Sequence, residues 1–411
     1  MSIAASRDVL RPQNVFTNWL FGLALACAPL VFRLLRMLRP ILRIGNRVVV
    51  TRYDDVREVF LNDQSFRVPY REKLDVIMGR QPFFLSMDDT PDYRRDTAAM
   101  RKVILQSDIP ARLAPQVERR AEKIVAANGR LEVVDALVRQ VTFEVLGEYF
   151  GISNPPDGDL RVWATRLFEF QFADASNDPE LRREVDDIAP KLRDHIQTLI
   201  EKRRKSGRVI DDVLGRCLIK QDAKETGFSD DQIRTSLMGF MVGGPPQPPM
   251  VAPQALEQLL RRPDALAGAQ HAAVSNDDKA LAGYVFEAMR FDPLAPALPR
   301  VATRASSIAA GTRRAVTVPE GATVYVAFSS AMMDQRRLLQ PRSFNPRRLS
   351  HEYIHFGYGL HTCFGLYINL AVLPLMLKPL LKQLRLRRAP GRQGHLRKRG
   401  VFADQLYVDY D

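Results

Sequence analysis

The chain has 411 residues, of which 46% are hydrophobic, and it carries a formal net charge of +13. That length and hydrophobic content suffice for a sizeable globular core. Three cysteines, Cys27, Cys217 and Cys363, without a C-x-x-C pair argue against a disulfide framework, and the six histidines form no H-E-x-x-H cluster that would indicate a zinc-type site. The positive charge suits an acidic protein partner or anionic lipid, whereas no recognition motif supports nucleic acid as a partner.

Residues 1–44 form an N-terminal segment that precedes the main domain. Trp19–Phe32 is an uninterrupted run of apolar residues, Gly and Pro, which is short for a transmembrane helix and is interrupted by Pro29. Leu and Ile then alternate with arginines as far as Arg43, as in helices that lie on membrane surfaces. Export is not expected, because the segment lacks the features of a signal peptide. We expect a cytoplasmic protein whose first segment is either an amphipathic helix, lying on a membrane or over the substrate entrance, or an ordinary helix packed on the fold.

Between residues 45 and 411 the pattern is that of one mainly helical domain. A β-branched run after a Gly-Asn turn predicts a hairpin over Arg43–Arg52, and a second strand pair is predicted over Ala315–Ser329, around Pro319-Glu320-Gly321. Phe66–Ser86 has no clear periodicity. Helical periodicity is found in Tyr53–Leu61, Thr90–Tyr149 with a break near Asn128-Gly129, Leu160–Phe172, Leu181–Lys205, Ser229–Arg262, Ala280–Phe291 and Phe364–Leu384. The predicted fold class is therefore mainly α with small β-sheets.

The most informative run is Phe356-Gly357-Tyr358-Gly359-Leu360-His361-Thr362-Cys363-Phe364-Gly365. Cys363 follows a Gly-punctuated loop and precedes a long apolar helix, so it lies at a helix N-terminus, where backbone N–H groups and the dipole favour a thiolate. A thiolate is the donor with which a haem iron favours O–O cleavage. The run F-G-x-G-x-H-x-C-x-G resembles the haem-binding loop of the cytochrome P-450 superfamily.

The resemblance implies the cytochrome P-450 fold, a single haem-binding domain over residues 45–411, and haem b (iron protoporphyrin IX) as the cofactor. Cys363 is then the axial ligand of the iron, and Phe356 packs near its sulfur. Gly357 and Gly365 belong to the same loop. The cations or donors expected to hold the haem propionates are His361, Arg300, Tyr93 and Arg101.

Two family motifs are matched with departures. Glu287-Ala288-Met289-Arg290 gives E-x-x-R, in which Glu287 and Arg290 share one helix face and form a buried structural ion pair. The usual third member is an Arg in a P-x-R-F turn, but Pro341-Arg342-Ser343-Phe344 has Ser there, so Arg342 or Arg347 is the expected substitute. In the early H-x-x-x-R motif, Tyr93 replaces His and Thr97 replaces Arg, which leaves Arg101, one turn further on, as the expected cation.

The largest departure lies in the distal helix. Phe240–Met250 aligns with the family's A-G-x-[DE]-T motif, so that Gly243 and Gly244 fall on Ala-Gly, Pro246 on the acid and Gln247 on the Thr. Four prolines within residues 245–249 predict that the helix opens there, because each lacks an N–H and clashes with the preceding turn. Pro246 cannot supply a proton, whereas the Gln247 amide can hydrogen-bond a peroxide. Gly244 and Gln247 are the candidate catalytic positions.

The function implied is oxidation of a hydrophobic, fatty-acid-like substrate, with monooxygenase-class hydroxylation as the leading interpretation and an acidic ferredoxin-type protein as redox partner. The altered distal motif keeps two alternatives open, a peroxide-dependent peroxygenase and a lipid-hydroperoxide isomerase. An alternative of another class is a haem sensor or carrier without turnover. The residues expected to line the substrate pocket are Phe83, Phe84, Gly243, Leu294, Ala297 and Leu298.

Overall fold

The computed structural model describes residues 9–12, 15–127 and 129–411. The helices of its first half are α1 (Val15–Leu38), α2 (Tyr53–Leu61), α3 (Arg71–Met78), α4 (Pro91–Val103), α5 (Ala114–Ala126), α6 (Gln140–Phe150), α7 (Leu160–Phe168) and α8 (Pro179–Ser206). Those of its second half are α9 (Val213–Asp222), α10 (Asp230–Gly243), α11 (Pro248–Leu260), α12 (Pro263–Val274), α13 (Asp278–Phe291), α14 (Phe328–Ala331) and α15 (Leu366–Leu381). The mainly helical class predicted from the sequence is confirmed.

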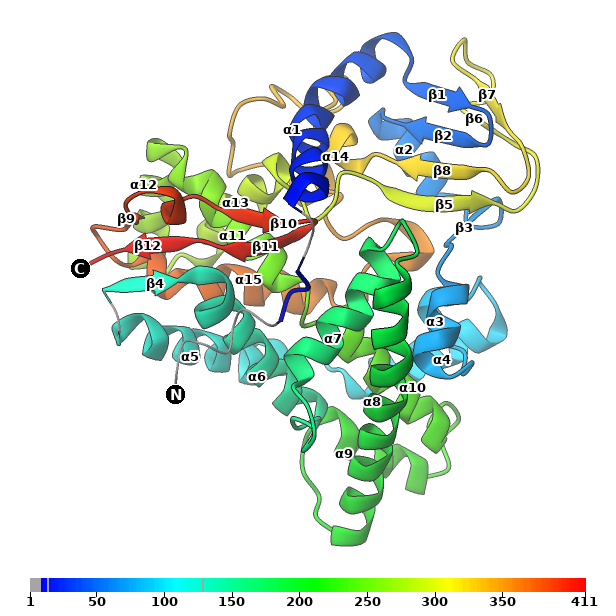
Figure 1. The fold of residues 1–411 in the computed structure, drawn as a ribbon, viewed down its shortest axis with the longest axis vertical. Helices are drawn as coiled ribbons and strands as arrows, with labels where there is room; N and C mark the ends of the chain where they lie inside the picture. Colours follow the sequence, from blue (N-terminus) through cyan, green and yellow to red (C-terminus); the bar gives the residue numbers. More distant parts are fainter. Residues whose placement is uncertain (1–8, 13–14, 128) are drawn as a thin grey trace.

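The strands are short and form four small sheets. They are β1 (Ile41–Ile44), β2 (Arg47–Val50), β3 (Phe66–Arg67), β4 (Arg130–Glu132), β5 (Leu298–Ala302), β6 (Ser306–Ile308), β7 (Val316–Val318), β8 (Thr323–Val326), β9 (Arg387–Arg388), β10 (Arg397–Arg399), β11 (Phe402–Gln405) and β12 (Tyr407–Asp409). The largest sheet has the order β1-β2-β8-β5-β3 and lies at one end of the molecule, beside the helical region (Figure 1).

The predicted hairpin over Arg43–Arg52 is confirmed, since β1 and β2 pair antiparallel with Ile41 opposite Val50. The strand pair predicted over Ala315–Ser329 is wrong. β7 pairs with β6, whereas β8 runs parallel to β2 and antiparallel to β5. The turn does not close a hairpin because Gly321 donates its N–H to the carbonyl of Ala302 at 2.8 Å, which directs β8 onto β5.

Helix α1 is longer than the apolar run suggests and continues through Pro29. The prediction that Pro29 interrupts the segment is therefore wrong. Within α1, Asn18–Leu38 is long and apolar enough to cross a membrane, by length and composition only, and 6% of the most apolar stretch is buried. Because β1 pairs with β2, the end of the proposed segment 1–44 is part of the main sheet.

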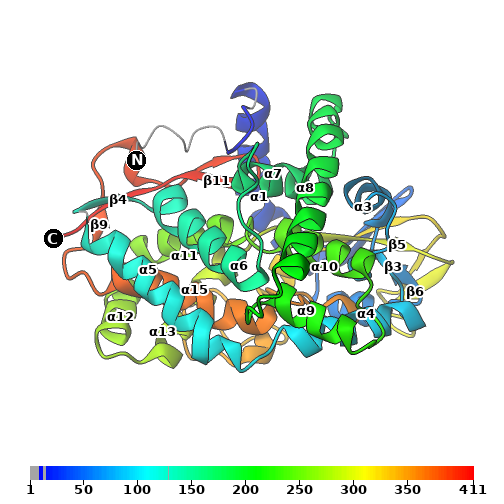
Figure 2. The same ribbon diagram turned by 90° about the horizontal axis from the view of Figure 1, so that it is seen from below.

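The helical core surrounds α15, which lies among α5, α11 and α13 in both views (Figures 1 and 2). Most side chains from Val372 to Leu381 are buried there, which explains the nearly uniform apolar sequence of this helix. Just before α15 begins, the ring of Phe364 lies 5.3 Å from that of Phe240 in α10, measured between centroids. Asn128, where the sequence predicts a break, lies outside the described residues.

Candidate functional site

Cys363 lies three residues before the last long helix, which begins at Leu366. Its backbone N–H donates to the carbonyl of Phe356 at 2.8 Å, which closes the loop between them. Burial raises the pKa of the Cys363 thiol, and a hydrogen bond from the Gly365 amide opposes that shift without cancelling it. A metal cation bound at the sulfur would favour the thiolate, because a coordinating thiol loses its proton.

The glycines of the loop are required by its geometry. Gly357 and Gly359 both have φ of +74°, a conformation that side chains with a Cβ rarely adopt. At Gly359 an added Cβ would lie 2.5 Å from the carbonyl oxygen of Phe60, at the end of α2. At Gly365 it would lie 3.3 Å from Asn369 Nδ2 and 3.9 Å from the sulfur of Cys363. The loop is thus packed closely against α2 on one side and its own helix on the other.

Tyr93 and Arg101 both reach this loop from α4. The Tyr93 hydroxyl donates to the carbonyl of Leu360 at 2.7 Å, and its ring meets that of His361 edge-on at 5.8 Å. The Arg101 guanidinium lies 5.2 Å from the ring centroid of Phe364. Burial and the nearby Arg300 lower the pKa of His361 to about 4, so its imidazole is neutral near pH 7.

Arg300 is a buried cation that has no carboxylate partner among the described residues. It is 5% exposed, its Nη1 donates to the carbonyl of Pro299 at 2.9 Å, and its guanidinium lies 4.9 Å from the ring of Phe60. Burial lowers the pKa of Arg300, and a hydrogen bond with Tyr70 opposes the shift. A buried charge is costly unless it is paired. Arg300 therefore fits an anionic group such as a haem propionate.

Glu287 and Arg290 form an ion pair at 2.6 Å with both side chains fully buried. The third arginine is Arg348, whose Nε lies 3.2 Å from Glu287 Oε1 and whose side chain is 2% exposed. The expectation of Arg342 or Arg347 was wrong, because these two side chains face outward from the same turn. The Tyr353 hydroxyl donates to Glu287 Oε2 at 3.1 Å, so the carboxylate is satisfied on both oxygens.

The predicted opening of the distal helix is confirmed. α10 ends at Gly243 and α11 begins at Pro248. Across the gap, the backbone N–H of Gln247 reaches only the carbonyl of Gly244, at 3.2 Å, and the prolines donate nothing. The side-chain Nε2 of Gln247 donates to the carbonyl oxygen of Gly243, which the interrupted helix leaves without its usual partner.

An aromatic cluster joins the distal helix to the cysteine loop. Phe364 lies 5.3 Å from both Phe84 and Phe240, measured between ring centroids, and Phe83 contacts Phe84 at 4.3 Å. The structure thus brings the predicted rings Phe83 and Phe84 to the residue next to Cys363. Phe240 was missed by sequence reasoning, although it lies one helical turn before Gly243 and Gly244, a spacing that places it on the same face.

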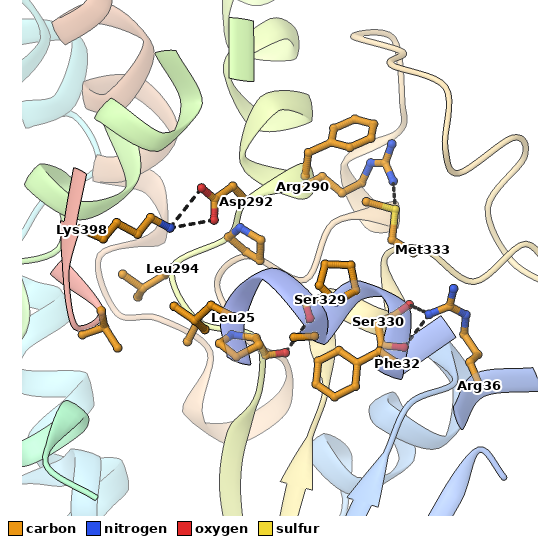
Figure 3. A pocket seen from close by; sticks show the side chains of 17 residues that line it. Leu25, Phe32, Arg36, Arg290, Asp292, Leu294, Ser329, Ser330, Met333 and Lys398 are labelled. Atoms are coloured by element: carbon orange, nitrogen blue, oxygen red, sulfur yellow. Dashed lines mark hydrogen bonds and ion pairs between the residues drawn. The ribbon is translucent and has the colours of Figure 1, made fainter. Parts of the chain in front are cut away.

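Three further predicted pocket residues lie at the start of β5 or on the segment just before it. Leu294, Ala297 and Leu298 are half-buried. Leu294 also lines a hollow of about 140 Å³ between this segment and α1, together with Leu25 and Phe32 of α1 (Figure 3). An ion pair between Lys398 and Asp292, at 3.0 Å, lies beside the hollow. Leu294 is therefore both a predicted pocket residue and part of the lining of a cavity that α1 covers.

Comparisons with known proteins identify relatives of the chain. The chain is 26% identical over 260 residues to cyclomarin C epoxidase of Salinispora arenicola, covering 62% of this chain and 61% of that protein. It is 24% identical to a bifunctional dioxygenase–epoxy alcohol synthase of Pyricularia oryzae, covering 86% of this chain and 34% of that protein. The structure of P450BioI in complex with hexadec-9Z-enoic acid ligated acyl carrier protein superposes with a TM-score of 0.80 at 18% identity, covering 95% of this chain and 100% of that one.

A family model described as cytochrome P450 matches residues 163–403, which is more than half of the chain. The haem of this family is iron protoporphyrin IX, and the residues described above fit it: a cysteine before the start of a helix, a loop with two glycines at positive φ, and a buried arginine without a carboxylate partner among the described residues. The chain belongs to the cytochrome P450 family and is an oxidoreductase of the monooxygenase class.

Proposed function

We propose that this protein hydroxylates a hydrophobic, fatty-acid-like substrate at a haem ligated by Cys363. The observation that carries the proposal is the arrangement around the Cys363 loop, where Phe364 packs on Phe84 and Phe240 and where the buried cation Arg300 lies close enough to lower the pKa of His361. Such an oxidation needs a charged donor for the haem iron, a cation for a carboxylate of the cofactor, and an apolar wall for the substrate.

In this proposal Arg300, His361, Tyr93 and Arg101 hold the haem at its propionate edge. Arg300 supplies the buried positive charge, and the neutral imidazole of His361 supplies a hydrogen bond. Tyr93 keeps the loop in place through the carbonyl of Leu360. Bound haem supplies an iron centre whose thiolate donor favours O–O cleavage. Phe356 and Phe364, which belong to the same loop as Cys363, would limit water at the sulfur and so tune the metal by lowering the local polarity.

In this proposal the residues around Gln247, in the interrupted distal helix, determine whether O₂ or a peroxide is the oxidant. The carbonyl of Gly243 fixes one N–H of the Gln247 amide, and the second N–H is free to orient an oxygen-containing reactant. No acid or alcohol side chain follows in the positions that normally relay protons in this family, because Pro245, Pro246, Pro248 and Pro249 surround Gln247. With O₂, the protons then come from ordered water or from the substrate.

A second candidate function is peroxide-dependent oxidation or isomerisation of a lipid hydroperoxide. The interrupted helix favours it, because a peroxide arrives already reduced and needs no proton relay for that step. The likeness to the bifunctional dioxygenase–epoxy alcohol synthase of Pyricularia oryzae supports an alternative of this kind. Gln247 is the residue that would orient the peroxide in either version.

A fatty-acyl substrate is supported by the apolar wall and by the fold that the chain shares with P450BioI, whose structure holds an acyl carrier protein charged with a fatty acid. The charge of +13 supports an acidic, ferredoxin-type redox partner. We further propose a cytoplasmic location, a catalytic domain over residues 45–411, and an N-terminal segment, 1–44, that contacts a membrane peripherally.

A parallel assay tests the proposal. The purified protein receives a fatty acid with NADPH and a surrogate ferredoxin and reductase, the same fatty acid with hydrogen peroxide, or a lipid hydroperoxide alone. Hydroxylated product in the first arm supports the leading function, and product mainly in the second or third arm supports the alternative. Absence of product in all three arms, with haem bound, would contradict both and favour a sensor or carrier.

A further inference from the structure

The outer face of α1 is the largest set of exposed apolar side chains on any one described element. Its large hydrophobic residues with more than a third of their surface exposed are Trp19, Leu20, Phe21, Leu23, Leu30, Val31, Leu34, Met37 and Leu38. Such a contiguous apolar surface marks a contact with a membrane or another molecule. No Asp or Glu occurs in the sequence of α1, so no acidic group of the helix opposes such a contact.

Both ends of α1 are fastened to the body of the protein. At the start, the Asn18 side chain donates to the carbonyl of Lys398 at 3.3 Å and accepts from the Gly400 N–H at 2.7 Å. Near the end, Arg36 Nη1 donates to the carbonyl and the hydroxyl of Ser330 at 2.9 and 2.6 Å. A helix held at both ends lies along the molecule. α1 therefore cannot cross a bilayer without breaking these contacts, despite its sufficient length.

An arginine cluster surrounds the C-terminal end of α1. It consists of Arg33, Arg36, Arg52, Arg336 and Arg342, and Arg52 Nε donates to the carbonyl of Arg36 at 3.3 Å. Burial lowers the pKa of Arg36, and the charges of Arg336, Arg342 and Arg33 lower it further. Asp334 opposes them, but it is 1% exposed and already paired with Arg336 at 3.2 Å. The cluster thus holds excess positive charge.

Building on the peripheral membrane contact proposed above, we propose that α1 lies in the plane of a bilayer surface, with its outer face among the acyl chains. The exposed members of the arginine cluster, Arg33, Arg336 and Arg342, bind the phosphate groups of anionic phospholipids. An apolar face bordered by arginines is the pattern of an interfacial helix. The apolar side chains argue against an acidic protein as the occupant, and the excess positive charge argues against a zwitterionic surface. The inner face of α1, which carries Leu25 and Phe32, then places the hollow beside Leu294 directly behind the membrane surface (Figure 3).

Sedimentation with vesicles of phosphatidylglycerol or phosphatidylcholine tests the charge requirement. The full-length protein should bind the anionic vesicles, and added salt should weaken the binding. Arg33→Gln with Arg342→Gln should weaken it by about 25-fold, since each arginine near an anionic surface contributes about a five-fold gain in affinity. The matched control Arg119→Gln with Lys123→Gln, two exposed cations on α5, should bind as the parent does. Equal binding to both vesicle types would overturn the proposal.

The two tryptophans report the orientation of α1. Trp19 on α1 is 60% exposed, whereas Trp163 in the core is 9% exposed and serves as the unquenched background. Lipids brominated near the headgroup should quench the emission more than lipids brominated at the chain end, and alkaline carbonate should release the protein. Stronger quenching by the deep bromines together with resistance to carbonate would show a spanning helix and contradict the proposal.

The membrane contact does not depend on the proposed chemistry. Cys363→Ser, which should abolish the haem-thiolate signature, should bind anionic vesicles with the affinity of the parent protein. Leu30→Gln with Leu34→Gln should lose vesicle binding while it keeps haem. Loss of vesicle binding in Cys363→Ser would mean that the surface forms only with the cofactor in place, and the proposal as stated would fail.

Discussion

The side-chain amide of Gln247 donates a hydrogen bond to the backbone carbonyl of Gly243 across the break between α10 and α11. A proline-rich segment leaves helix carbonyls without donors, and Gln247 satisfies one of them. The same contact fixes the amide: Nε2 must face Gly243, because a carbonyl can only accept. Gln247, which aligns with the Thr of the family motif, is therefore held in place by a carbonyl of α10, the helix that ends just before it.

The first prediction concerns Gln247→Ala. This variant should lower peroxide-supported product formation by about five-fold or more, because a donor hydrogen bond to the reactant contributes about 1 kcal/mol or more. Rates with hydrogen peroxide at saturating substrate check it. Gln247→Thr should not restore efficient coupling with NADPH, because Pro246 still denies the helix an acid and a backbone donor. Well-coupled turnover by the parent protein with NADPH, and none with peroxide, would show that water or substrate relays the protons.

The second prediction concerns the buried triad of Glu287, Arg290 and Arg348. Arg348→Ala should lower the free energy of unfolding by about 3–5 kcal/mol, because it removes one partner of a fully buried ionic network. Arg342→Ala and Arg347→Ala, in the same turn but exposed, should change it by less than about 0.5 kcal/mol. Urea unfolding of the three variants measures the difference. A larger loss in Arg347→Ala than in Arg348→Ala would contradict the assignment of the third arginine.

The third prediction concerns Arg300→Leu. The variant should bind haem more weakly, because the cation proposed for a propionate is gone. The haem-free chain should be as stable as the parent or more stable, since a buried charge without a carboxylate partner has been removed. Haem transfer to apomyoglobin and thermal unfolding of the haem-free chain measure the two effects. Arg94→Leu, which removes an exposed cation of α4, should leave haem retention unchanged. Equal haem retention in both variants would contradict the role of Arg300.

The fourth prediction concerns His355, beside Phe356. Its Nε2 donates to the carbonyl of Phe286 at 2.9 Å, its Nδ1 has no partner among the described residues, and burial lowers its pKa to about 4. Between pH 6.5 and 4 the unfolded chain binds a proton that the folded chain does not, so the free energy of unfolding should fall as the pH falls, by up to about 3 kcal/mol. Unfolding curves across this range should show that slope in the parent protein and a smaller one in His355→Phe. Equal slopes in the two proteins would contradict the assignment of this pH dependence to His355.

Much of the fold could be predicted because local signals and packing agree. Tyr53–Leu61 has both helical periodicity and acidic residues in its first turn, and it forms α2 with those bounds. The strand pair over Ala315–Ser329 failed, because pairing of β8 with β2 is a contact between distant parts of the chain that no local pattern encodes. The position of the C-terminal end of α1 could not be predicted for the same reason, because it depends on the contact between Arg36 and Ser330, which lie far apart in the sequence.

The residues of the candidate site also divide into those that the sequence identifies and those that only the structure identifies. Cys363, Glu287 and Arg290 are found from motifs because their spacing carries the chemistry. Arg348 could not be chosen over Arg347 from the sequence, because the geometry of the turn decides which of two adjacent arginines points toward Glu287. Arg300 could be named from its position in the sequence, but its burial and its lack of a carboxylate partner among the described residues are properties of packing that only the structure gives.

The measurement that tests the central claim most directly is the absorption spectrum of the reduced, CO-bound protein and its three cysteine variants. Cys27 is exposed, Cys217 is buried in α9, and Cys363 lies in the loop before α15. The account predicts the thiolate-type band in the parent, in Cys27→Ser and in Cys217→Ser, and its loss in Cys363→Ser with haem still bound. A normal thiolate band in Cys363→Ser would contradict the assignment of the axial ligand and, with it, the proposed site.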